Sequence, residues 1–142
     1  MSGKELLVRK IESGIVIDHI PAGKAFLVLK LLRLDPEAKV LLAMNVDSRK
    51  LGRKDFIKIE GRYLTSKEID LIALVAPEAT VNIIEDWKVK EKRRIEPPKM
   101  VEGVFHCPNP LCPTNSPYKP PKTRFRVEAG GRAEETRLHC EY

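Results

Sequence analysis

Hydrophobic and polar residues near the start of the chain recur with the periods of one strand and one helix. Residues 14–20 (GIVIDHI) are rich in β-branched side chains and end at a proline, which predicts a strand. Residues 22–34 then carry apolar side chains at helical spacing and stop before Asp-Pro-Glu. We expect a helix there, with Phe26, Leu29 and Leu32 along one apolar face and Ala25 and Leu34 nearby.

The pattern from residue 38 to residue 92 predicts a second helix and further strands. Thr65 and Glu68 have capping-box spacing, and the helix that they open stops at Ala76, before a proline. The order is therefore strand, helix, strand, strand, helix, strand, with one strand added. Connection rules then favour an α+β fold, the ferredoxin-like split βαβ sandwich. The further strands are predicted at residues 38–46, 53–60, 79–84 and 87–92.

The strand predicted at residues 53–60 separates apolar from charged side chains. Ile57 and Ile59 fall on one face, whereas Lys54, Phe56 and Lys58 fall on the other. The isoleucine face should pack on the core. The lysine face is either an exposed part of the sheet or part of a binding site.

Proline usage divides the chain into two parts. Eight of the eleven prolines lie between Pro97 and Pro121, so we place a domain boundary near residue 96. Residues 1–96 would form the ferredoxin-like domain. Residues 97–142 would form a small all-β domain that is too short to be stable by apolar burial alone.

Composition and charge narrow the function classes. Apolar residues make up 42% of the 142 residues, yet no apolar run reaches the length of a membrane span or a signal peptide, so we expect a soluble, cytoplasmic protein. The net charge is +6. Residues 88–94 (KVKEKRR) hold much of it, which is typical of a solvated strand or of a site for phosphate-bearing ligands.

The three cysteines lie in the second part and have the pattern of a metal site. Cys107 and Cys112 form a C-x4-C turn, and Cys140 stands two residues from the end. Thiolates in this arrangement suggest Zn²⁺ held between two hairpin turns, as in a zinc ribbon. Such a structural metal would supply the folding energy that a small domain lacks.

The fourth metal ligand has rival candidates in the sequence. His106 and His139 each sit beside a cysteine, which makes joint ligation geometrically poor. A C-x-x-C second half would need its last cysteine one position beyond Tyr142. We therefore expect a fourth cysteine past the end of a truncated chain, and weak zinc binding by the chain as it stands.

No nucleophile-and-base pattern, Gly-rich phosphate loop or paired carboxylate motif stands out, so catalysis is not expected. Asp18 and His19 are neighbours, and neighbours in a regular strand face opposite ways, which excludes a dyad there. His19 is either a satisfied strand-end histidine or a phosphate or ribose contact. If Asp18, Lys58 and the basic strand after Trp87 converge, they would suit a nucleoside triphosphate.

Several blocks of the sequence are individually distinctive. They are VIDHIPAGKA (16–25), GRKDFIKIE (52–60), APEATVNII (76–84), the basic strand through Lys92 and CPNPLC (107–112). In this order and spacing, from about Val8 to Tyr142, the chain resembles the regulatory chain of aspartate carbamoyltransferase. The resemblance implies a non-catalytic subunit with a nucleotide-binding domain, which takes CTP, ATP and sometimes UTP, followed by a zinc domain. It also implies regulatory dimers that bridge trimers of the catalytic chain.

The resemblance assigns roles by position. Main-chain groups around Lys10 and Ile11 would meet the base, and Asp18 and Lys92 would hold the ribose. Lys58 would contact base and ribose, and His19 the phosphates. The residues expected to line or border the site are Val16, Ile84, Val89, Asn82 and Lys54, and the one expected at the contact with the catalytic chain is Asn109.

The chain departs from the family pattern at two places. Trp87 stands where relatives carry a tyrosine, and the cysteine that follows the one matching Cys140 is absent. The alternative function is a zinc-ribbon module that binds nucleic acid through residues 88–94 and 122–127. Aromatic residues make up only 6% of the chain and no stacking motif is present, which weighs against that alternative.

Overall fold

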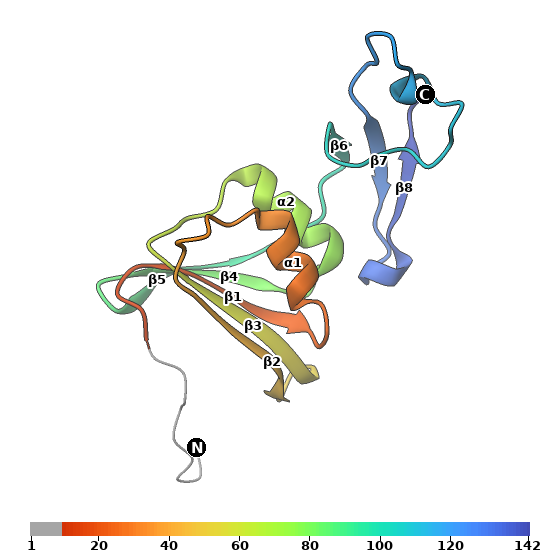
Figure 1. Ribbon diagram of the computed structural model, residues 1–142. Helices are drawn as coiled ribbons and strands as arrows, with labels where there is room; N and C mark the ends of the chain where they lie inside the picture. Colours follow the sequence, from red (N-terminus) through yellow and green to blue (C-terminus); the bar gives the residue numbers. More distant parts are fainter. Residues whose placement is uncertain (1–9) are drawn as a thin grey trace.

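The computed structural model describes residues 10–142, so the start of the resemblance near Val8 lies outside the described residues. A five-stranded antiparallel sheet has the order β2-β3-β1-β4-β5 and carries two helices, α1 and α2, on one face (Figure 1). This order confirms the predicted ferredoxin-like sandwich with one added strand. The elements are β1 (Gly14–Pro21), α1 (Ala25–Leu32), β2 (Val40–Ser48), β3 (Gly52–Glu60), α2 (Ser66–Val75), β4 (Thr80–Glu85) and β5 (Lys88–Arg94).

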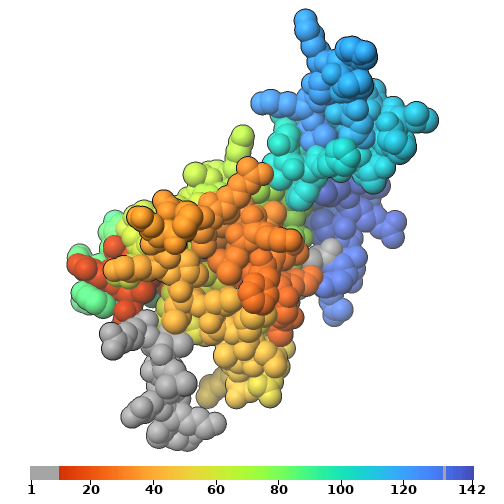
Figure 2. Space-filling model, viewed as in Figure 1, coloured from red at the N-terminus to blue at the C-terminus, as the bar shows by residue number. Residues whose placement is uncertain are grey.

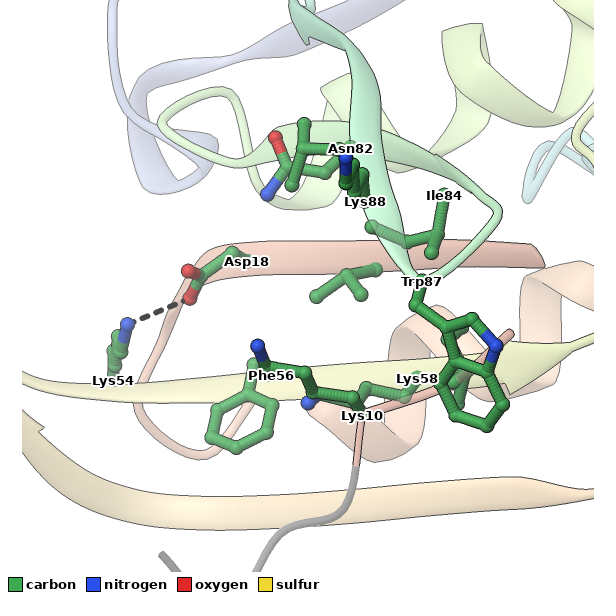
Figure 3. A pocket seen from close by; sticks show the side chains of 12 residues that line it. Lys10, Asp18, Lys54, Phe56, Lys58, Asn82, Ile84, Trp87 and Lys88 are labelled. Carbon is green, nitrogen blue, oxygen red and sulfur yellow. Dashed lines mark ion pairs between the residues drawn. The ribbon is translucent and has the colours of Figure 1, made fainter. Parts of the chain in front are cut away.

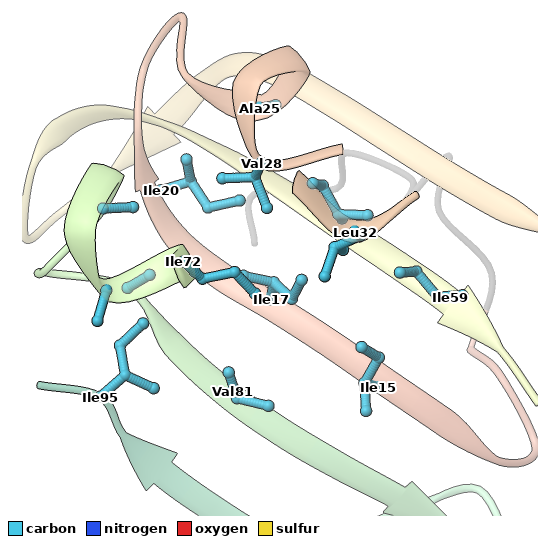
Figure 4. Packing of buried hydrophobic residues seen from close by; sticks show 14 residues of the cluster. Ile15, Ile17, Ile20, Ala25, Val28, Leu32, Ile59, Ile72, Val81 and Ile95 are labelled. Carbon is cyan, nitrogen blue, oxygen red and sulfur yellow. The ribbon is translucent and has the colours of Figure 1, made fainter. Parts of the chain in front are cut away.

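The core lies between the sheet and the two helices (Figure 4). Ile57 and Ile59 of β3 are fully buried in it, as their alternation with lysines predicts. The two helices cover the face of the sheet on which the core lies (Figure 1). Its other large members are Ile15, Ile17, Ile20, Val28, Leu32, Ile72, Val81 and Ile95.

The predicted buried face of α1 is partly wrong. Phe26 is 62% exposed, whereas Ala25, Val28 and Leu32 are buried and Leu29 is partly buried. Ala25, Val28 and Leu32 follow the i, i+3, i+7 spacing of one helical stripe, and Phe26 lies about 100° away from Ala25 around the axis. The small Ala25 lets the helix approach the sheet, so the helical phase, and not side-chain size, determines what is buried.

The start of α2 has the predicted capping box. The Thr65 hydroxyl accepts a hydrogen bond from the Glu68 amide at 3.2 Å, and the Glu68 carboxylate accepts one from the Thr65 amide at 3.1 Å. Two of the amides that a helix N-terminus leaves unpaired are therefore satisfied. Neither helix of the described chain is long and apolar enough to cross a membrane.

The second part of the chain is a three-stranded antiparallel sheet in the order β6-β7-β8. It forms a separate lobe in the space-filling view (Figure 2). Its buried cluster consists of Phe125 and two cysteines, with Phe105 and Cys140 packed against it. Because this core is so small, the lobe needs a stabilising cross-link. The strands are β6 (Met100–Glu102), β7 (Arg124–Glu128) and β8 (Arg137–Cys140), with short 3₁₀ turns at Pro113–Asn115 and Ala133–Glu135.

Candidate functional site

A cavity of about 570 Å³ lies on the face of the first sheet that the helices leave open (Figure 3). The alternation in β3 creates it, because Lys54, Phe56 and Lys58 point away from the buried isoleucines. Strands β1, β4 and β5 and the segment before β1 supply the rest of the wall. The other lining residues are Lys10, Ile11, Val16, Asp18, Asn82, Ile84, Trp87, Lys88 and Val89.

A carboxylate stands among the cations of this cavity. Lys54 Nζ lies 2.8 Å from Asp18 Oδ1, and the main-chain amide of His19 donates to the same carboxylate at 2.7 Å. Burial by itself raises the pKa of Asp18, but these two hydrogen bonds outweigh it, and the pKa lies below its usual value. Asp18 is therefore an ionised acceptor, suited to hydroxyl groups of a ligand.

Lys58 lies deeper in the cavity than a surface lysine. Its Nζ is 5.9 Å from the centre of the Phe56 ring, and Lys54 Nζ is 5.8 Å from the same ring. Burial lowers the pKa of Lys58, and the positive charge of Lys10 lowers it further, although Asp18 opposes both. An anionic ligand beside Lys58 would offset the cost of its partly desolvated charge.

The strand that carries His19 is not regular. The pairing of β1 with β3 shifts between Ile17 and Ile20, and His19 adopts a left-handed conformation with φ of 56°. The bulge places His19 Nδ1 3.9 Å from Asp18 Oδ2, so the expectation that the two side chains face opposite ways is wrong. The Nδ1 atom also lies 3.4 Å from Thr80 Oγ1.

Burial and the neighbouring lysines favour the neutral form of His19. Burial lowers its pKa below the ordinary value of 6.5, and Lys54, Lys50 and Lys92 lower it further, whereas Asp18 raises it. An anion bound beside His19 would oppose the effect of these lysines and raise its pKa.

Asn82 offers an acceptor inside the cavity. Its Oδ1 atom is buried and has no hydrogen-bond partner within the described structure. It pairs across the sheet with Lys92 of β5 and with Val16 of β1. A buried acceptor left unpaired is costly, so the Asn82 oxygen is available to a donor group of a ligand in the cavity.

The apolar end of the cavity is formed at the tight β4–β5 hairpin. Asp86 and Trp87 both have positive φ, 51° and 67°, as a two-residue hairpin turn requires. The Trp87 amide donates to the Glu12 carbonyl at 3.0 Å and thereby holds the segment before β1 against the turn. A tryptophan in this conformation is strained, and such strain is typical of functional sites.

The cavity therefore brings together most of the residues singled out in the sequence. All of the predicted nucleotide-site residues line it except His19 and Lys92, which lie beside it, next to Asp18 and opposite Asn82. Sequence reasoning did not include Phe56 and Lys88 in the site, although the alternation of β3 pointed to Phe56. The ligand roles of these residues remain predictions.

The three cysteines meet in the second lobe. Their Sγ atoms all lie within 4.8 Å of one another, and those of Cys112 and Cys140 are 3.7 Å apart. Thiolates bound tetrahedrally at typical zinc–sulfur distances would be about 3.8 Å apart. Hydrogen bonding with Thr114 lowers the pKa of Cys112, which favours the thiolate. The geometry fits a metal held by sulfur.

Neither rival histidine joins the cysteine cluster among the described residues. His139 Nε2 instead lies 2.7 Å from Glu128 Oε2, on the outside of the sheet. Asn109 shapes the turn between the first two cysteines, because its Oδ1 accepts from the Leu111 amide at 3.0 Å. The Leu111 side chain is 88% exposed at the tip of this turn.

Fold and sites together define a class: a chain with a ligand cavity on a ferredoxin-like sheet and a small metal-binding lobe beside it. Two family models match the chain. Residues 6–96 match the allosteric domain of the aspartate carbamoyltransferase regulatory chain, and residues 99–142 match its metal binding domain. The chain belongs to the aspartate carbamoyltransferase regulatory chain family and is a regulatory, non-catalytic subunit.

Curated relatives carry the same description. The aspartate carbamoyltransferase regulatory chain of Hyperthermus butylicus is 57% identical over 128 residues, which cover 89% of this chain and 80% of the relative. That of Staphylothermus marinus is 49% identical over 140 residues, covering 97% and 84%. That of Pyrococcus abyssi is 50% identical over 141 residues, covering 97% and 90%. The similarity spans both lobes and does not favour a free-standing nucleic-acid-binding module.

Proposed function

We propose that the cavity on the first sheet binds nucleoside triphosphates, CTP and ATP with UTP as a further candidate. Binding would regulate aspartate carbamoyltransferase and with it the first committed step of pyrimidine synthesis in the cytoplasm. One observation carries the proposal: a single cavity runs from an apolar end at Ile84 and Trp87 to the half-buried ion pair of Asp18 and Lys54, with further lysines along its length (Figure 3). Base, ribose and phosphates follow one another in that order of polarity.

The proposed contacts follow this order. Main-chain groups near Lys10 and Ile11 meet the base, and the base packs against apolar side chains. Ribose hydroxyls bind Asp18 and Lys92, and the phosphates bind His19. Lys58 contacts base and ribose, while Lys54 and Asn82 border the site. The apolar side chains are Val16, Ile84, Val89 and Trp87.

We propose residues 1–96 as the allosteric domain and residues 97–142 as the domain that docks on the catalytic chain. The metal would be structural Zn²⁺ bound by Cys107, Cys112 and Cys140, which suits thiolate ligands. The metal would fix the turn around Asn109, whose exposed position supports a contact with the catalytic chain. Pairs of regulatory chains would bridge catalytic trimers.

Calorimetric titration with CTP and with ATP tests the proposal, with and without purified catalytic trimer. We expect one saturable nucleotide site per regulatory chain in both cases. With the trimer present, nucleotide should also change carbamoyltransferase activity. If neither nucleotide binds the chain in either state, the proposed function is wrong.

Nucleotide binding should take up a proton at His19. The pKa of His19 is lowered in the free protein and should rise when phosphates approach, so affinity should increase as pH falls from above the pKa of the complex towards that of the free protein. Titrations near the ordinary histidine pKa, in two buffers of different ionisation enthalpy, count the protons. His19→Gln should take up fewer than the parent, and equal uptake would exclude this role.

The regulatory chain should dimerise through β2. Among residues 10–142 no further strand covers either edge of the first sheet, but β5 carries mostly charged side chains, whereas β2 exposes Val40, Leu41 and Met44. Charged edges resist pairing and apolar edges favour it. Leu41→Glu should convert the dimer to a monomer in sedimentation equilibrium. Leu111→Glu, an equal change on the other lobe, should leave the dimer intact, and a monomeric parent would contradict the prediction.

A further inference from the structure

One fully buried carboxylate lies outside the cavity and touches three elements at once. Asp55 of β3 has no exposed surface. Its Oδ2 accepts hydrogen bonds from the amides of Gly23 at 2.9 Å and Ala25 at 3.1 Å, and its Oδ1 accepts one from the amide of Asn45 at 2.8 Å. Burying a charged group is costly unless hydrogen bonds compensate it. Here the three amides provide that compensation, and the carboxylate in turn fixes their positions.

The three amides belong to irregular segments, the turn between β1 and α1 and the bulge of β2, where Asp55 adds to the main-chain hydrogen bond from the Lys24 amide to the Pro21 carbonyl at 3.1 Å. Lys24, at the start of α1, makes no capping bond with its side chain, so the Asp55 carboxylate caps that helix from another strand. Asn45 has a positive φ of 57° at the point where the pairing of β2 with β3 shifts. Asp55 therefore fixes both the turn that leaves β1 and the bulge of β2.

The turn that leaves β1 begins where the cavity has its ionic end. Asp55 lies opposite Ile20 in the sheet. Ile20 is the residue that immediately follows His19, which has the left-handed conformation. Its neighbour Lys54 points to the opposite face and pairs with Asp18. The chain between His19 and Ala25 is thus anchored at its far end by one carboxylate.

We propose that Asp55 is a positioning residue of the nucleotide site, which it never touches. By holding the amides after β1, its carboxylate keeps the bulge that turns His19 towards the phosphate end of the cavity. The inference rests on the proposed nucleotide function. Asp55→Asn preserves size, but it replaces one acceptor oxygen with an N–H₂ donor that faces an amide donor. The turn or the β2 bulge then loses its anchor.

Affinities for cytidine and for CTP, measured by calorimetry, separate positioning from general stability. Asp55→Asn should leave cytidine affinity unchanged and lower CTP affinity about tenfold, the scale of one charge-assisted hydrogen bond. In a His19→Ala background the same substitution should have little further effect, because it acts through that side chain. Asp47→Asn, an exposed aspartate on β2 whose ion-pair partner is Arg53, is the matched control and should change neither affinity.

Loss of affinity for cytidine and CTP alike, or full additivity with His19→Ala, would overturn the positioning role. If the parent binds CTP no better than cytidine, the proposed function fails instead, whatever Asp55 does. If Asp55→Asn does not fold, Lys24→Ser is added to give α1 a capping side chain of its own. The comparison is then made between Lys24→Ser and the double variant, with the same expected loss of CTP affinity.

Discussion

Replacing Cys112 with serine should release the metal and unfold the second lobe while the first sheet stays folded. Among its described residues the lobe buries only Val101, Cys107, Cys112 and Phe125, so its apolar burial cannot offset the entropy of ordering some forty residues. A complete four-ligand zinc site contributes on the order of 10 kcal/mol in small domains, and three thiolates should hold the metal more weakly but still stabilise the lobe. The core of the first sheet contains no residue of β6, β7 or β8 and should survive.

Amide hydrogen exchange and metal analysis measure this outcome. Exchange should become fast across β6, β7 and β8 and stay slow in β1, β3 and β4. His139→Ala is the control, because His139 binds Glu128 and lies outside the cysteine cluster. That variant should keep its metal content. Metal loss from His139→Ala, or a protected second lobe in Cys112→Ser, would refute the three-thiolate assignment.

Substituting Lys58 with alanine should weaken CTP binding by about 1–3 kcal/mol, the range for a lost hydrogen bond to a charged group. Lys58 lies on the open face of β3 beside Phe56, and its charge is partly desolvated before any ligand arrives. Lys92→Ala should have a similar effect from β5. Circular dichroism should not change, since neither side chain enters the core.

Lys67→Ala provides the matched control for charge. Lys67 is an exposed lysine of α2, on the helical side of the sheet and away from the cavity. It should bind CTP as the parent does at every salt concentration. Parental affinity in both Lys58→Ala and Lys92→Ala would show that the proposed contacts are misplaced.

The features that the sequence predicts correctly are local ones. The alternation of isoleucine and lysine in β3 predicts which face of the strand is buried. The capping-box spacing of Thr65 and Glu68 predicts the start of α2. Each of these two predictions depends on side chains only a few residues apart, so the regular geometry of a strand or a helix is enough to make it. The order of elements then allows few closures of the sheet, so the fold follows from local signals plus connection rules.

The features that the sequence does not predict depend on contacts between distant residues. The bulge at His19 and the anchoring by Asp55 arise from hydrogen bonds that join β3 to two other segments, and no periodicity encodes them. The buried stripe of α1 is a similar case. Which of Ala25 and Phe26 faces the sheet depends on where the helix begins, and that start is fixed by Asp55 from another strand.

The location of bound nucleotide can be observed in a crystal structure of the chain with CTP. We expect the base beside Trp87 and the segment around Lys10 and Ile11, and the phosphates near His19. Lys58 and Asp18 should contact the groups between them. Nucleotide bound elsewhere, for example along the outer edge of β5, or a cavity that stays without nucleotide at saturating CTP, would contradict the proposal that this cavity is the effector site.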